Sequence, residues 1–466
     1  MENMTKIQRL WGAIFLCLFL LIPILFVGSS FVVCLFFIAV VIWGVKKLKF
    51  KRFPWILFVT ACSFRILICV VVDTPVISDF AVLLNASRRL AEGDLTFNSS
   101  EYFLLWPYQI GFVFVQGLFL KIVNSVFFLK VINCFVTAGI CTLVYQIARV
   151  FIKEEYAKSV SILYAFLPFP MTYVTVLTNQ HLSAFLMYFG IYIILTDEIR
   201  IRDTIRYLCA GVLIALGNVV RPEGIIAIFS VVLYLILTIN KNKWKVVLKN
   251  IIAIVGAYFI IVSAVTSFFV VTEISPNGLD NNASYWKFVL GFNHETSGMY
   301  AEEDTWVLEE GNESEAWQLV RDRVLTNPRA LGKLFLNKID KFWNDSSLEW
   351  SFGHLYEKNI EIGDRSLLAK PLIDWLDEYE GYAMLSSYIL TAVGTFFYVV
   401  KRWQYNQKIL LLINLIFVTF GVYLLIEVQG RYVYFVQISV LILSGTGLQV
   451  LMDKGAKFRT AIKCKS

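Results

Sequence analysis

Long apolar stretches separated by short polar ones fill most of this 466-residue chain. A transmembrane helix needs about 20 mainly apolar residues, so the pattern predicts an all-α, multi-pass membrane protein with about 12–13 apolar segments. These segments cover residues 10–27, 29–45, 54–72, 103–120, 126–149, 157–177, 181–196, 207–220, 224–239, 250–272, 382–400, 408–427 and 432–451. The first is interpreted as an uncleaved span, because no small-residue cleavage site follows it.

Two longer polar stretches interrupt the apolar segments, at residues 73–102 and 273–381. Within the second, Glu315–Trp343 has apolar residues at three- and four-residue steps, which predicts an amphipathic helix broken at Asn327-Pro328. We therefore expect a mainly helical loop domain between two membrane parts. The predicted units are a transmembrane module at 1–272 with a first loop at 73–102, a loop domain at 273–381, transmembrane helices at 382–451 and a basic tail at 452–466.

Basic residues gather between the apolar segments, and cytoplasmic loops of membrane proteins carry an excess of Lys and Arg. The clusters lie at 46–52, 200–206, 241–249, 401–402 and 454–463. Placing them in the cytoplasm puts both long polar stretches, and the turns at Arg221 and Arg431, on the extracytoplasmic side of the cell membrane. This arrangement requires an even number of crossings between residues 100 and 180, where three segments occur. Segment 103–120 is the weakest, and it either spans or is re-entrant or interfacial.

Composition supports this interpretation. Hydrophobic residues make up 58% of the chain and charged residues 17%, against about 25% charged in soluble proteins. The net charge of +7 comes from clusters beside apolar segments, so it does not indicate nucleic-acid binding. The chain has no Walker motif and no GxGxxG after a strand, which disfavours a nucleotide-driven pump.

Asp79 is the first candidate for chemistry. Ser78 is a plausible N-cap for a short interfacial helix that begins at Asp79. A carboxylate at the membrane surface can act as a general base, or it can be a solvated residue favoured by the helix dipole. The spacing alone leaves both interpretations open.

Three arginines are candidates for binding an anionic lipid headgroup. Arg431 lies at an expected outer boundary, where guanidinium can bind phosphate in bidentate fashion, although an ordinary ion pair with Glu427 is equally compatible. Arg221 with Glu223 poses the same choice. Arg65 lies in the middle of a span, where a charge usually faces the bundle interior or a polar cavity.

Several motifs together resemble the GT-C glycosyltransferases of family 39, which include protein O-mannosyltransferases and the aminoarabinose transferase of lipid A. Their order, more than any single motif, is similar to that of a bacterial member. The motifs are Asp79 with Leu90-Ala91-Glu92-Gly93 and Trp106-Pro107, then Arg221-Pro222-Glu223-Gly224, Gly291-Phe292-Asn293 and Glu427-Val428-Gln429-Gly430-Arg431-Tyr432.

This resemblance implies a GT-C-type helix bundle and an inverting transferase that uses a polyprenyl-phosphate sugar, with Asp79 as base. It also implies a set of residues for the lipid phosphate and substrate: Arg431, Arg221, Glu427, Gln429, Tyr432, Glu223 and, from its charge within a span, Arg65. The family often has a second acidic residue in a later turn, but here that turn reads Thr178-Asn179-Gln180-His181. This departure leaves a divalent cation, Mg or Mn, as an open question, and no metal ligand is predicted.

The acceptor is expected to be a cell-envelope polysaccharide, lipid or protein. Two other functions stay open: a cell-surface polysaccharide polymerase or ligase, and a lipid-sugar flippase or transporter. Transporters often have two similar halves with broken helices, and the sequence has no such symmetry.

Overall fold

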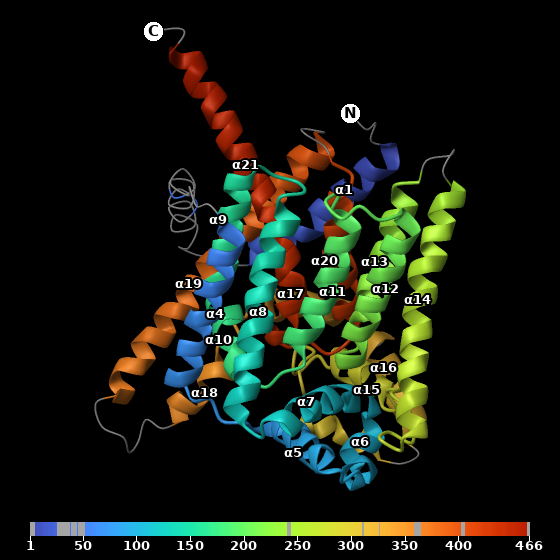
Figure 1. The fold of residues 1–466 in the computed structure, drawn as a ribbon. Helices are drawn as coiled ribbons and strands as arrows, with labels where there is room; N and C mark the ends of the chain where they lie inside the picture. The colour runs from blue at the N-terminus through green and yellow to red at the C-terminus, as the bar shows by residue number, and fades with distance from the viewer. Residues whose placement is uncertain are drawn as a thin grey trace.

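The computed structural model describes residues 5–25, 38, 44, 52–239, 244–309, 312–325, 327–357, 365–401 and 406–463. The predicted segment 29–45 and the basic residues 46–51 lie outside these residues, apart from positions 38 and 44. Within the described residues the secondary structure is entirely helical, so the all-α prediction is confirmed. Figure 1 shows the bundle, with both chain ends at one end of it and the shorter helices at the other.

The helices of the bundle are α1 (Lys6–Phe19), α2 (Leu21–Leu25), α4 (Phe53–Val71), α8 (Val126–Ala148), α9 (Glu154–Ala165), α11 (Gln180–Leu195), α12 (Asp203–Val220), α13 (Gly224–Leu237), α14 (Trp244–Val271), α19 (Arg365–Thr395), α20 (Ile409–Leu425) and α21 (Tyr434–Lys463). The remaining described helices are α5 (Ser78–Glu92), η1 (Thr96–Ser99), α6 (Glu101–Leu105), η2 (Pro107–Gln109), α7 (Ile110–Ile122), α10 (Pro168–Thr172), η3 (Tyr173–Thr175), α15 (Ser284–Gly291), η5 (Glu302–Leu308), α16 (Glu313–Leu325), α17 (Pro328–Trp343), α18 (Glu349–Glu357), η6 (Phe396–Val400) and η7 (Gly430–Val433).

Seven described helices are long and apolar enough to cross a membrane, and three more apolar helices are shorter. The long spans cover Lys6–Leu25, Phe53–Val71, Val126–Ala148, Asp203–Val220, Trp244–Val271, Lys370–Val400 and Gly430–Gly455, and the shorter helices are α11, α13 and α20. The multi-pass prediction is therefore confirmed.

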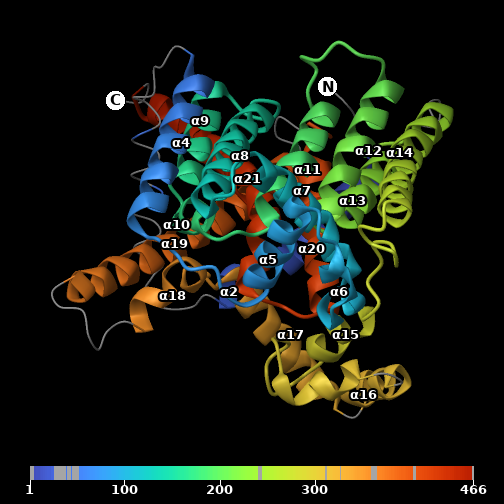
Figure 2. The same cartoon turned by 60° about the horizontal axis from the view of Figure 1, so that its bottom comes forward.

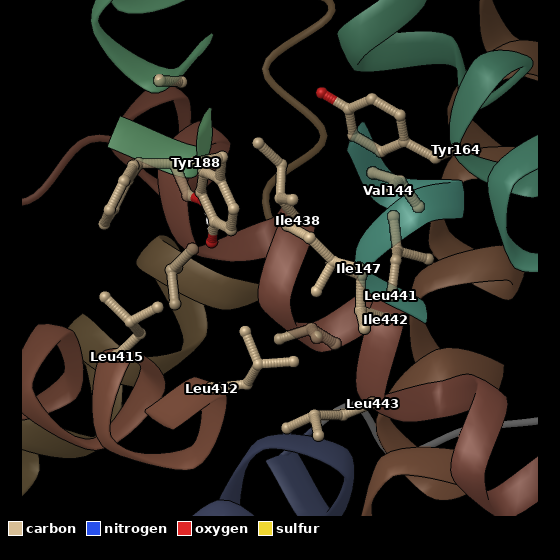
Figure 3. Close-up of a cluster of buried hydrophobic side chains, with 14 of the residues drawn as sticks. Val144, Ile147, Tyr164, Tyr188, Leu412, Leu415, Ile438, Leu441, Ile442 and Leu443 are labelled. Atoms are coloured by element: carbon tan, nitrogen blue, oxygen red, sulfur yellow. Dashed lines mark hydrogen bonds between the residues drawn. The ribbon is translucent and has the colours of Figure 1, made fainter. Parts of the chain in front are cut away.

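Helix α21 forms the centre of the bundle. Buried residues make up 89% of its apolar stretch, against 22% in α14, which lies at the periphery. Figure 3 shows Ile438, Leu441 and Ile442 of α21 packed between side chains of α8, α9, α11 and α20. The Tyr188 hydroxyl is 2.9 Å from the Phe435 carbonyl and 2.7 Å from Ser439 Oγ, which satisfies a buried polar group inside this core. The turn at residues 426–433 leads directly into this buried central helix.

The segment predicted at 103–120 does not form a span. It is divided at Pro107 into α6, η2 and α7, and the 13 residues of α7 extend only about 20 Å against the ~30 Å of a bilayer core. Proline interrupts the helix because it lacks the backbone N–H and restricts the residue before it. Helices α5, α6 and α7 lie together at the end of the bundle away from both termini (Figures 1 and 2). Between residues 100 and 180, α8 is the one described helix that is long and apolar enough to cross a membrane.

The predicted helix Glu315–Trp343 is present and interrupted where expected. It consists of α16 and α17, and the Asn327 side chain accepts hydrogen bonds from the Arg329 and Ala330 backbone N–H groups, both 3.1 Å long. Helix α19 continues unbroken from Arg365 to Thr395 and so passes through the predicted boundary at 381–382. Apolar content marked only the membrane part of α19 and missed its charged first half.

Candidate functional site

A polar cavity of about 530 Å³ lies where α5, the turn after α12, α15 and the turn before α21 meet. This size is typical of a site for a small ligand. Seven site residues predicted from the sequence line it: Asp79, Arg221, Glu223, Glu427, Gln429, Arg431 and Tyr432. Residues separated by more than 350 positions therefore meet in one place, as the motif order suggested.

Asp79 lies in the first turn of α5, exposed to the cavity. The helix begins at Ser78 after Ile77, and neither residue makes a side-chain cap, so the prediction of Ser78 as N-cap is wrong. The other end closes at Gly93, whose φ of 85° is the left-handed conformation that glycine adopts readily. Burial raises the pKa of Tyr102, and the Asp79 charge adds to this shift, which puts the phenol and the carboxylate within electrostatic reach.

Arg431 is held above aromatic rings. Its guanidinium carbon lies 3.9 Å from the Trp350 ring centroid and 5.3 Å from that of Phe80. Its Nε donates to Gln429 Oε1 at 2.6 Å, and the Gln180 side chain donates to its backbone carbonyl. The ion pair with Glu427 considered above does not form, and within the described ranges no carboxylate lies at ion-pair distance from Arg431. The guanidinium is therefore oriented by neutral partners and keeps its charge for an anion.

Arg221 and Glu223 do form an ion pair, with Arg221 Nε 2.6 Å from Glu223 Oε1. Arg221 also donates to Asn179 Oδ1 at 3.0 Å, and its guanidinium lies 5.2 Å from the Tyr432 ring centroid. The turn between α12 and α13 therefore lines the cavity with charged, hydrogen-bonded side chains.

Lys287 of α15 was not predicted, and it is the third cation of this cavity. It forms an ion pair with Glu427, whose side chain is 2% exposed. Backbone bonds reinforce the contact, because Glu427 N–H donates to the Lys287 carbonyl and Val428 N–H to the Gly298 carbonyl, both at 2.8 Å. Although burial favours the neutral acid, Lys287 and the amide of Gln429 hold the pKa of Glu427 below its ordinary value. The only sequence signal was one charge in the apolar helix Ser284–Gly291.

Aromatic side chains line another part of the cavity. Tyr102 and Trp106 have ring centroids 5.0 Å apart, and Tyr108 and Trp286 also contribute to the lining. Flat apolar rings beside charged groups suit a ligand with both an apolar face and hydroxyl groups. Trp106 was part of the predicted motif, whereas the two tyrosines were not singled out.

Arg65 lies away from this cavity. It is completely buried in α4, and one of its terminal nitrogens donates to the carbonyls of Ala61 and Ala165, the latter at the end of α9. It therefore faces the bundle interior, one of the two expected environments, and it satisfies a carbonyl just before the break at Pro168. The cavity gives no support to the expectation that it binds the lipid phosphate there.

Four carboxylates line the cavity: Asp79, Glu223, Asp280 and Glu427. Glu223 and Glu427 are each paired with a cation, and the turn Thr178–His181 contributes no carboxylate. His181 is buried and lies 2.9 Å from the Tyr434 hydroxyl and 3.1 Å from the Tyr173 carbonyl. Across the part of the chain that the structure describes, no three His, Cys, Asp or Glu side chains are arranged to hold an ion. No step of the chemistry is therefore assigned to a metal.

Residues 109–268 match the sequence model of a family described as dolichyl-phosphate-mannose-protein mannosyltransferase. The match covers about a third of the chain and confirms, for that region, the resemblance predicted from the sequence. It includes Arg221 and Glu223 but neither Asp79 nor Arg431. No curated protein sequence matches the chain.

Two solved structures from Archaeoglobus fulgidus are similar to this chain at low levels. One is an oligosaccharyltransferase in the apo form, with a TM-score of 0.47 and 13% identity over 90% of this chain and 53% of that one. The other is the oligosaccharyltransferase AglB in complex with an inhibitory peptide and a dolichol-phosphate, with a TM-score of 0.41 and 11% identity over 89% and 52%. The chain thus spans about half the length of these structures.

Proposed function

We propose that this chain is a membrane glycosyltransferase that moves a sugar from a polyprenyl-phosphate carrier to an acceptor hydroxyl on the extracytoplasmic face. The single observation that carries the proposal is the cavity itself, which is lined by two exposed carboxylates, Asp79 and Asp280, and by three cations contributed by separate segments. The matched family's printed name supports a lipid-phosphate sugar as donor and a protein as acceptor.

The chemistry needs few groups. Asp79 takes the proton of the acceptor hydroxyl, and the oxygen attacks the anomeric carbon of the donor from the face opposite the phosphate. The bond between that carbon and the phosphate oxygen breaks, and the polyprenyl phosphate leaves with the electron pair. The anomeric configuration is therefore inverted. A phosphate leaves as an anion, so it requires cations rather than a proton donor.

Arg431 is the main phosphate ligand in this proposal, because neutral partners orient it and no carboxylate neutralises it. Arg221 and Lys287 add positive charge but are partly compensated by Glu223 and Glu427. The aromatic rings of Tyr102 and Trp106 pack on the sugar. Apolar side chains that line the same cavity, Phe80, Leu83 and Val262, lie where the first isoprene units of the carrier meet the phosphate.

The charge distribution supports the proposed face. The segment before α12, the start of α14 and the end of α21 carry basic residues, and they lie at the end of the bundle opposite α5, α6 and α15 (Figure 1). Because Lys and Arg favour the cytoplasmic side, the cavity opens to the other side.

The test is transfer by the purified full chain from a radiolabelled polyprenyl-phosphate sugar to a peptide acceptor, analysed for product length and anomeric configuration. Asp79→Asn should lower the rate by about 10²–10⁴-fold, the usual contribution of a general base. Asp73→Asn, six residues earlier and outside the cavity lining, should leave it unchanged.

Full activity in Asp79→Asn, or loss of activity only in Asp280→Asn, the other unpaired carboxylate of the cavity, would assign the base elsewhere. Long polymers would instead indicate a polymerase. Movement of the donor across vesicles without covalent transfer would indicate a transporter.

A further inference from the structure

A second polar depression lies behind the turn that carries Arg431. It consists of two adjoining hollows of about 220 and 580 Å³, which share Asn344, Asp345, Ser346 and Asp377. One wall is the end of α17 with the start of α18, and the other is the first half of α19, and Figure 2 shows α18 beside α19. We call it the acidic groove, because it is lined by Asp340, Asp345, Glu349, Asp377, Glu378 and Glu380.

The charges of this groove are not balanced from within. Lys341 is the one basic side chain among the lining residues. None of the six carboxylates takes part in an ion pair among the residues that the structure describes. Side chains elsewhere in the loop domain behave differently, since Asp304 is paired with Arg323 at 2.8 Å. Glu380 is 3% exposed, and its two oxygens accept hydrogen bonds from the Phe169 N–H and the Gln437 amide. The other five carboxylates are exposed or half-buried, and such a group at a concave surface attracts cations.

Buried acceptor atoms in the groove also lack donors. Gln437 is 2% exposed, and its amide nitrogen donates to Glu380 Oε1, but its Oε1 has no hydrogen-bond partner. Asn344 Oδ1 and the Oγ of Ser347, a residue 1% exposed, are likewise unpartnered. A buried acceptor without a donor costs about 1–3 kcal/mol. These three atoms therefore favour a ligand that brings N–H donors.

One short segment separates the groove from the polar cavity. Gln429, Arg431 and Tyr432 line the cavity, whereas Val433 lines the groove. Between them, Gly430 lies so close to Asp345 and Ser347 that an added Cβ would be 2.5–2.7 Å from their atoms. Burial raises the pKa of Glu349, Asp345 adds to this shift, and Lys341 and Arg431 oppose it, so the charges of both sites act on one carboxyl.

Resting on the function proposed above, we propose that the acidic groove binds a lysine- or arginine-containing segment of a polypeptide acceptor. The basic residues occupy the groove while the hydroxyl to be glycosylated reaches past Gly430 to Asp79. The acids are spread along two walls, which suits spaced side chains of a flexible chain rather than a single ion. The described side chains offer no three-ligand metal arrangement there, which also favours an organic cation.

The test uses the full chain in nanodiscs of uncharged phosphatidylcholine and a fluorescein-labelled peptide with four lysines around one serine. Binding is measured by fluorescence anisotropy without any donor, so it does not depend on catalysis. Asp345→Asn with Asp377→Asn keeps the shape and removes two charges, and should weaken binding about three- to tenfold. Asp374→Asn, an exposed residue of the same helix that does not line the groove, is the matched control and should bind as the original chain does.

The same peptide with acetylated lysines should bind the original chain as weakly as the double variant binds the charged peptide. Equal affinity of the double variant and the original chain would overturn the proposal. So would binding of glucosamine oligomers but not of the peptide, which would assign the groove to an amino-sugar polymer. Asp79→Asn should bind the peptide normally, so a failure of the transferase proposal remains distinguishable from a failure of this one.

Discussion

The polar cavity and the acidic groove lie on opposite sides of residues 429–433, and they treat charge differently. In the cavity, Lys287 and Arg221 are each held by a carboxylate, and Arg431 is positioned by an amide and two aromatic rings. In the groove, five exposed or half-buried carboxylates and the buried Glu380 face one lysine. Charges paired within a protein stabilise and position its segments, whereas unpaired ones remain available to a ligand. Paired charges such as Lys287 and Glu427 therefore position the turn, whereas unpaired charges such as Arg431 and the acids of the groove are available to bind ligands.

The largest effect is expected from Lys287→Met. Because Glu427 is 2% exposed, removing its partner leaves a buried charge uncompensated and costs about 3 kcal/mol of unfolding free energy. Lys287→Met with Glu427→Gln should recover much of the loss. Thermal unfolding in detergent measures both, and equal stability of the single variant and the original chain would contradict the structural role of the pair.

The same variant has a predictable pH dependence. In the original chain the folded pKa of Glu427 is below the ordinary value, so its contribution to stability is complete above about pH 4.5 and is lost as pH falls through the folded pKa. Without Lys287, burial raises that pKa, and protonation relieves the penalty at acidic pH. The difference in unfolding temperature between the two proteins should therefore shrink from pH 8 to pH 5.

Arg431→Gln tests whether an unpaired cation binds the carrier. A hydrogen bond to a charged group contributes about 1.5–3 kcal/mol, so kcat/KM for the lipid donor should fall about 10- to 100-fold. Arg431→Lys keeps the charge but not the bidentate geometry, and should retain part of the activity. If Arg431→Gln lost peptide binding to the groove but used the lipid donor normally, Arg431 would serve the acidic groove and not the phosphate of the carrier.

Much of this arrangement could be predicted from the sequence, because membrane helices and turn motifs are local features. Arg221, Glu427 and Arg431 were identified by their positions between apolar segments together with the motifs that resemble the glycosyltransferase family. Lys287 was not, because its significance depends on a contact with Glu427 across 140 positions. Arg65 was predicted as a ligand from its charge alone, but whether a span faces a cavity or a neighbouring helix depends on packing.

The acidic groove was missed for a related reason. Asp377 and Glu378 precede the apolar part of α19, so they fell within the predicted loop domain at 273–381 and were not singled out. Only the continuous helix from Arg365 and the turn at Gly430 bring them opposite Asp345.

A smaller effect is expected from Gly430→Ala, which acts on the wall between the two sites. The new methyl group would overlap Asp345 and Ser347, and such overpacking costs about 1–3 kcal/mol. Both peptide affinity and transfer should decrease, because the wall is common to both. Gly421→Ala, on α20 with no atom within 4 Å of the added Cβ, is the control and should change neither. A decrease in transfer alone would show that the groove is independent of the turn.

The smallest effect is expected from Lys341→Gln, and its sign makes it informative. Lys341 is the one basic residue that lines the groove, so its removal makes the potential there more negative. Exposed charge interactions contribute about 0.2–1 kcal/mol, so affinity for the lysine peptide should rise by up to about fivefold. Added salt should reduce the difference, because exposed charges are screened.

Most substitutions in a binding surface weaken binding, and a general disruption of the groove would do the same. Tighter binding that disappears at high salt is therefore explained by the charge of the groove, whereas weaker binding would mean that Lys341 itself contacts the peptide and that the acids do not dominate recognition.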